Sequence, residues 1–87
     1  MQLKLTYGQK ELLSHFPGAD GVSVRQVMLS VKNDHPEIYE RWCDVDGHLR
    51  ETLNVFINGE HMRYRNGLES ILNDGDEIYI VPLITGG

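Results

Sequence analysis

The residues with the clearest chemical potential are two glycines at the end of the chain, Gly86 and Gly87. Glycine loses the most backbone freedom on ordering and has no side chain to pack, so this pair contributes nothing to stability. A backbone without Cβ atoms does allow another protein to close tightly around it. We interpret the pair as a segment that a partner grips closely, with a remnant of truncation as the alternative.

No other set of reactive side chains has the spacing of a known site. The cysteine Cys43 has no partner cysteine and is predicted to be a small apolar residue beside Trp42. Asp44 and Asp46 precede Gly47 as at the start of a calcium loop, but the further ligands are missing, which predicts a surface turn. The four histidines have no metal-ligand spacing and are predicted to be solvated: His15, His35, His48 and His61. The sequence therefore predicts neither a catalytic side chain nor a metal site.

Composition limits the class of protein. A chain of 87 residues with 40% hydrophobic and 24% charged residues can form one globular domain. The net charge of −5 argues against a nucleic-acid backbone as partner, which requires clustered Lys and Arg. No apolar run approaches the roughly 20 residues of a membrane span, and residues 1–10 lack the long apolar block of a signal peptide. With a single cysteine, these features predict a cytoplasmic protein without a membrane or nucleic-acid partner.

The N-terminal half predicts a hairpin followed by a helix. Residues 3–7 alternate apolar and polar, and Gly8 fits the first central position of a type II′ turn. That turn places Leu5 opposite Leu12 and Leu3 opposite Ser14. The helix is indicated by the 3.6-residue period of Val24, Val27, Met28 and Val31, with Ser23 and Gln26 as a capping box. A second helix is predicted to begin at Pro36, with Ile38 and Trp42 on one side.

The C-terminal half predicts a second hairpin and a final strand. Asn58-Gly59 is a strong hairpin signal, and its register pairs Val55 with Met62 and Leu53 with Tyr64. A helical turn is predicted through 68–72, then a tight turn at 73–75. The last strand, 77–83, is apolar at nearly every position, which is typical of the middle of a sheet.

These elements predict an α+β protein with a β-grasp fold, in which a mixed sheet packs on one main helix. The central last strand is expected to lie beside the first strand. The predicted core consists of apolar residues that share the helix-facing parity: Leu3, Leu5, Leu12, Val24, Val27, Val31, Val55, Ile57, Leu68, Leu72, Ile78 and Ile80.

The other face of this sheet is a candidate docking surface. Phe56 has the parity opposite to Val55, so it is predicted to share a face with Tyr79 and Val81, and Leu83 has the same parity. An exposed apolar patch usually marks an interaction site. The alternative is that long loops fold over this face.

The stretch from Val55 to Gly87 resembles the ThiS/MoaD family of ubiquitin-like sulfur carriers. The matching motifs are V-x-I-N-G at 55–59, L-x-D-G-D-E-I at 72–78, the strand proline Pro82, and the terminal Gly86-Gly87. The segment 22–42 also resembles the family's first helix and the turn after it. Two features depart from many molybdopterin-synthase small subunits, namely the tight turn at 7–10 and the residues 83–85 before the glycines.

The resemblance implies a carrier and not an enzyme. An E1-like adenylating enzyme would use ATP to activate the carboxylate of Gly87, with Gly86 and Thr85 threading into its site. Sulfur would then replace the adenylate, and the thiocarboxylate would serve a sulfur-accepting synthase or sulfurtransferase. No cofactor is expected to be bound to the chain itself. The expected organisation is a β-grasp domain over 1–83 and a flexible tail over 84–87.

The resemblance leaves the pathway open among molybdopterin, thiamine, cysteine and tRNA sulfur biosynthesis. It also leaves two other roles open. One is a ubiquitin-like modifier that is conjugated to lysines through Gly87, and the other is an interaction module whose tail does no chemistry.

Overall fold

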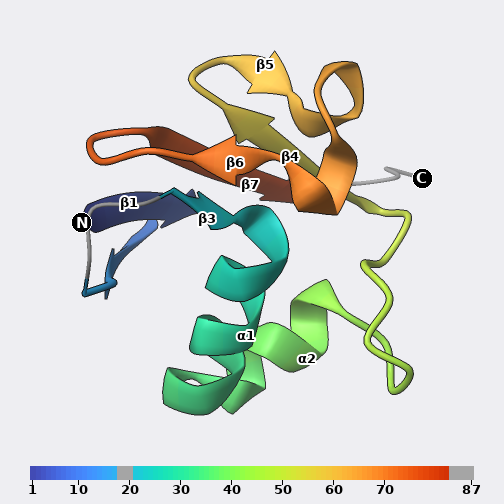
Figure 1. The fold of residues 1–87 in the computed structure, drawn as a ribbon. Helices are drawn as coiled ribbons and strands as arrows, with labels where there is room; N and C mark the ends of the chain where they lie inside the picture. Colours follow the sequence, from blue (N-terminus) through green and yellow to red (C-terminus); the bar gives the residue numbers. More distant parts are fainter. Residues whose placement is uncertain (18–20, 83–87) are drawn as a thin grey trace.

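The computed structural model describes residues 1–17 and 21–82, and its strands form one main sheet covered by helices on one face (Figure 1). The order of the main sheet is β2-β1-β7-β4-β5. Its strands are β1 (Gln2–Tyr7), β2 (Lys10–His15), β4 (Leu53–Ile57), β5 (Glu60–His61) and β7 (Glu77–Pro82). The last strand β7 runs parallel to β1 and antiparallel to β4, so it occupies the predicted central place.

The first hairpin has the predicted turn and register. Gly8 has a φ of 61°, whereas Gln9 is not among the residues of positive φ, which matches a type II′ turn. Leu5 pairs with Leu12 and Leu3 with Ser14, as the alternating pattern required.

Two helices pack against the same face of the sheet (Figure 1). The first, α1 (Val24–Asp34), begins with the predicted capping box, in which Ser23 and Gln26 exchange side chain to backbone hydrogen bonds. The second, α2 (Pro36–Trp42), begins at Pro36 and buries Ile38 and Trp42. The described helices include none long and apolar enough to cross a membrane. The mixed sheet with its covering helices confirms the predicted β-grasp.

The core lies between the helices and the sheet and contains ten of the twelve predicted residues as buried side chains. Leu12 and Leu68 are only partly buried and pack at its edge. Trp42 is fully buried, and its ring meets that of Tyr7 edge-on with the centroids 5.4 Å apart. Among the described residues, the buried apolar side chains outside the predicted list are Met28, Ile38, Trp42, Cys43, Leu53 and Met62.

Two short segments differ from the prediction. The strand β5 ends at His61, and a 3₁₀ turn, η1 (Met62–Tyr64), replaces the predicted pairings of Val55 with Met62 and of Leu53 with Tyr64. The His61 ring accepts a hydrogen bond from the Arg63 N–H and so caps this turn. Tyr64 is exposed as a result.

The predicted helical turn through 68–72 is also wrong in its second half. A 3₁₀ turn, η2 (Gly67–Glu69), is followed by a two-residue strand, β6 (Ile71–Leu72). This strand pairs antiparallel with β3 (Val22–Ser23), which comes much earlier in the sequence. Val22 lies opposite Leu72, a residue 50 positions later in the chain. Leu72 is buried and Ile71 exposed, which is the alternation of a strand.

Candidate functional site

The face of the sheet opposite the helices carries an apolar patch. Phe56 on β4 lies directly opposite Tyr79 on β7, and Val81 follows Tyr79 on the same face. Tyr79 is 40% and Val81 45% exposed, whereas Phe56 is half-buried. The predicted shared face of these residues is therefore confirmed, although their role in docking stays a prediction. We call Phe56, Tyr79 and Val81 the open-face patch.

Polar groups border the open-face patch. On the β1 side, Thr6 lies beside Tyr79, and Lys4 forms an ion pair of 3.2 Å with Glu11. The hydrogen bond and charge of Glu11 raise the pKa of Lys4. On the β5 side, the His61 ring meets the Phe56 ring edge-on at 5.2 Å between centroids. An apolar centre with a polar border is the usual composition of a protein interface.

The predicted tail residues lie outside the described part of the chain. These residues are Leu83, Thr85, Gly86 and Gly87, together with the predicted boundary between the domain and the tail at 83/84. The last described strand residue, Pro82, pairs with Leu53 and directly follows Val81 of the open-face patch. The open-face patch therefore reaches to the residue before Pro82, the last residue that the structure describes.

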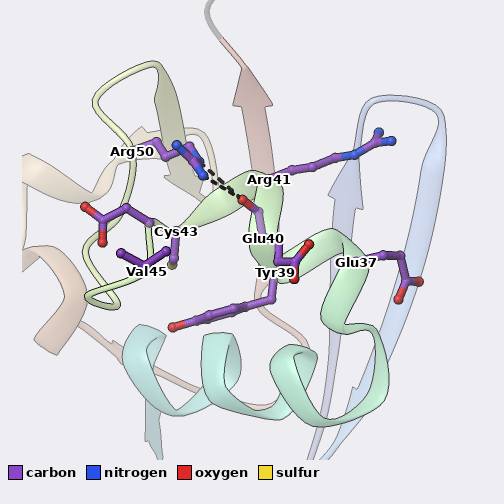
Figure 2. Close-up of a pocket in the computed structure, with 8 residues that line it drawn as sticks. Glu37, Tyr39, Glu40, Arg41, Cys43, Val45 and Arg50 are labelled. Carbon is purple, nitrogen blue, oxygen red and sulfur yellow. Dashed lines mark hydrogen bonds between the residues drawn. The ribbon is translucent and has the colours of Figure 1, made fainter.

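A groove of ≈ 650 Å³ lies on the helical side of the molecule, where α2 meets the loop after it (Figure 2). The Arg50 guanidinium donates two hydrogen bonds, of 3.2 and 3.0 Å, to the backbone oxygen of Glu40. Arg41 points away from Arg50, so the two do not converge on one ligand (Figure 2).

Cys43 contributes to this groove, and its surroundings disfavour the thiolate form. Its side chain is buried, as suits the small apolar role predicted for it, and burial raises its pKa. A raised pKa leaves little thiolate, which is the nucleophilic form.

The acidic loop after Cys43 forms the predicted surface turn. Ligand atoms of Asp44, Asp46 and His48 lie within 4.8 Å of one another. However, one carboxylate oxygen of Asp44 accepts the backbone N–H groups of Asp46 and His48, each at 2.9 Å. The bond from His48 is the main cause of the lowered pKa of Asp44. This carboxylate therefore holds the turn together.

Two of the four histidines predicted to be solvated, His35 and His61, are half-buried. His61 places its Nε2 3.0 Å from the Asn54 Oδ1. Burial, followed by the charge of Arg63, lowers its pKa. The hairpin register already places His61 opposite Phe56, so sequence parity alone could have assigned it to the open face.

Known proteins share this sequence and fold. The model of the ThiS family matches residues 8–87. The sulfur carrier protein CysO of Mycobacterium bovis is 31% identical over 84 residues, which cover 94% of this chain and 85% of CysO. A chain in the crystal structure of the Amycolatopsis orientalis BexX/CysO complex is 26% identical, with a TM-score of 0.76 and coverage of 98% of this chain and 99% of that chain.

The crystal structure of SAMP1 from Haloferax volcanii has a TM-score of 0.82, with all of both chains covered and 22% identity. At that identity the likeness establishes the β-grasp fold alone. The family match, in contrast, covers nearly the whole sequence up to and including Gly87. The chain therefore belongs to the ThiS family.

Proposed function

We propose that this chain is a sulfur carrier whose reactive group is the C-terminal carboxylate of Gly87. The observation that carries the proposal is the ThiS family match through Gly87, with a relative that is named a sulfur carrier protein. In this role the chain is a substrate of other proteins and not a catalyst.

The chemistry requires activation because a free carboxylate is a poor acyl donor. An E1-like adenylating enzyme transfers AMP from ATP to the Gly87 carboxylate and releases pyrophosphate. Hydrosulfide then attacks the acyl carbon, AMP leaves with one of the former carboxylate oxygens and the sulfur loses its proton, so that the carboxylate becomes a thiocarboxylate. The resulting thiocarboxylate passes its sulfur to a synthase or sulfurtransferase. ATP is consumed at the enzyme, and the carrier itself holds no cofactor.

The length and composition of the tail suit this reaction. Residues 84–87 span roughly 13 Å when fully extended, which is enough to reach into a nucleotide site from the end of the domain. Gly86 and Gly87 let the walls of a narrow channel approach the backbone, since neither has a Cβ atom. Thr85 directly precedes the two glycines and is the nearest residue to them that has a side chain. The open-face patch, extended by Leu83, is proposed to dock the domain while the tail enters.

The test is the intact mass of the protein after incubation with ATP, the adenylating enzyme of the same organism and a sulfur donor. The wild-type chain is expected to exchange one oxygen for sulfur. Gly86→Val and removal of Gly86-Gly87 should both abolish the exchange, as should one alanine appended after Gly87. The free energy of unfolding should change by no more than about 0.5 kcal/mol, because the substituted residues lie beyond the last described strand, which ends at Pro82.

A Cys43→Ser variant provides the matched control, since it removes the only thiol. It should exchange sulfur as the wild type does. If instead the Cys43→Ser variant fails and the truncated chain succeeds, the sulfur is carried on the cysteine and the proposal is wrong. Adducts linked to lysines in cell extract would support the protein modifier, and the absence of any modification would support the interaction module.

A further inference from the structure

The segment after β5 is held in place by the His61 ring, which forms contacts through both of its nitrogens. The His61 Nδ1 accepts a hydrogen bond of 3.0 Å from the Arg63 N–H and lies 3.4 Å from the Arg63 Nε. Because both of these groups are donors, Nδ1 carries no proton. The proton of the neutral ring is then on Nε2, where it is donated to the Asn54 Oδ1 at 3.0 Å. Neutral His61 therefore joins β4, β5 and η1.

The turn held in this way presents an arginine and a tyrosine to solvent. Tyr64 is 74% exposed, and the Arg63 guanidinium carbon lies 5.9 Å from the centre of its ring. Within the described residues, no carboxylate forms an ion pair with Arg63. Arginine and tyrosine are enriched among the residues that dominate binding energy at interfaces. An exposed pair of this kind is consequently poised for a partner.

This turn is continuous with the open-face patch. His61 caps η1 and at the same time contacts the Phe56 ring of the patch. Because β5 is antiparallel to β4, the chain runs from Ile57 back toward Leu53, the residue that pairs with Pro82. The turn η1 therefore lies beside β4, toward the end of the sheet where Leu53 pairs with Pro82.

The local charge of the turn is opposite to that of the whole chain. The sequence has a net charge of −5, whereas residues 60–65 contain two arginines and one glutamate. Arg65 uses its Nη2 to bind the Ile71 backbone oxygen at 3.0 Å, so Arg63 is the guanidinium that remains for a partner. A basic spot on an acidic surface can orient the molecule on a partner of complementary charge.

We propose that Arg63 and Tyr64 extend the docking surface and bind an acidic surface of the adenylating enzyme, with neutral His61 as the residue that positions them. The inference rests on the proposed function, because the partner is the enzyme that activates Gly87. It adds a charged contact at the edge of the open-face patch.

The test measures the affinity of the full-length chain for the adenylating enzyme, at low and at high ionic strength. Arg63→Glu should weaken binding by about tenfold or more at low salt, because it places like charges opposite each other. The matched control Arg63→Lys keeps the charge and should lose less. Raising the salt should weaken binding of the wild type more than binding of Arg63→Ala, since an exposed charge pair is screened. An altered salt dependence separates a charge contact from a merely structural role.

Two further variants test His61. His61→Leu removes the cap and should weaken binding, whereas His61→Asn offers a neutral acceptor to the Arg63 N–H and should restore it. The ¹⁵N shifts of the His61 ring should report protonation on Nε2 and not on Nδ1. A proton on Nδ1 in the folded protein would overturn the positioning role.

The outcomes separate this inference from the proposed function. If Arg63→Glu binds as tightly as the wild type while sulfur exchange at Gly87 proceeds, the extended surface is wrong and the carrier role stands. If the wild type binds the enzyme and Arg63→Glu does not, but no sulfur exchange occurs, the surface is supported and the carrier chemistry is wrong. If the wild type shows no binding, both are overturned.

Discussion

Tyr79 lies at the centre of the open-face patch, with Thr6 on one side and Phe56 on the other. Tyr79 as a whole is 40% exposed, so a partner can cover it without rearrangement of the sheet. Tyr79→Asp is expected to weaken binding to the adenylating enzyme by about 2 kcal/mol or more, because a charge would replace an apolar contact. The measurement is a binding isotherm together with circular dichroism of the variant. Unchanged affinity in a folded variant would place the interface elsewhere, for example at Asp74 and Asp76.

His61 makes stability depend on pH in a defined direction. Its pKa in the folded protein is lowered below the ordinary value of 6.5, first by burial and then by Arg63. The unfolded chain therefore takes up the proton at a higher pH than the folded chain does. The contribution of neutral His61 is fully present above 6.5 and is lost as the pH falls through the folded pKa.

The His61→Asn variant should therefore lose less stability than the wild type between neutral and mildly acidic pH. Urea unfolding at several pH values measures this difference. The same substitution at His15, which is exposed on β2, is the control and should follow the wild type. Parallel curves for the wild type and His61→Asn would contradict the lowered pKa.

At the scale of elements, Asn58 joins two turns that are distant in the sequence. It lies in the β4–β5 turn with a φ of 52°, followed by Gly59 with a φ of 88°, which matches the type I′ turn expected of Asn-Gly. Its side chain donates to the Asp76 Oδ1 and accepts from the Glu77 N–H, both at 3.0 Å. The tip of the hairpin is thereby attached to the start of β7.

Substitutions at Asn58 should separate the backbone effect from the hydrogen bonds. Asn58→Gly keeps a residue that tolerates positive φ but loses both side-chain bonds, at an expected cost of about 1–2 kcal/mol. Asn58→Ala loses the bonds and also requires a strained backbone, so it should cost roughly 1 kcal/mol more. Chemical denaturation of both variants checks the order. Equal stabilities would show that the left-handed conformation contributes little.

At the scale of the whole molecule, β7 holds the fold together because it lies between β1 and β4 in the sheet. Ile80 on this strand is 1% exposed and belongs to the core beneath the helices. Ile80→Ala should reduce the free energy of unfolding by about 2–5 kcal/mol, through lost burial and the cavity that remains. Val81→Ala on the opposite face is the matched control and should cost less than about 1 kcal/mol. The reverse order in thermal or urea unfolding would mean that the faces of β7 are inverted.

Local chemistry allowed much of this architecture to be read from the sequence. The capping box of Ser23 and Gln26, the Pro36 helix start and the Gly8 turn each depend on neighbours a few residues away. Strict alternation in β1 and β4 assigns each residue to one face, since adjacent strand residues point in opposite directions. For that reason parity predicted both the core and the shared face of Phe56, Tyr79 and Val81. The terminal glycines and the motif residues in turn indicated the ThiS family.

The tertiary structure decided what depends on contacts between distant segments. Ile71 and Leu72 form a strand only because Val22 and Ser23 lie beside them, and no local pattern near residue 71 reports that partner. The strand after Asn58-Gly59 stops at His61 because that ring caps a new turn and bonds Asn54 across the hairpin. Such hydrogen bonds require side chains that the fold first has to bring together. The basic turn beside the open-face patch is therefore a property of the folded molecule and not of any single stretch of the chain.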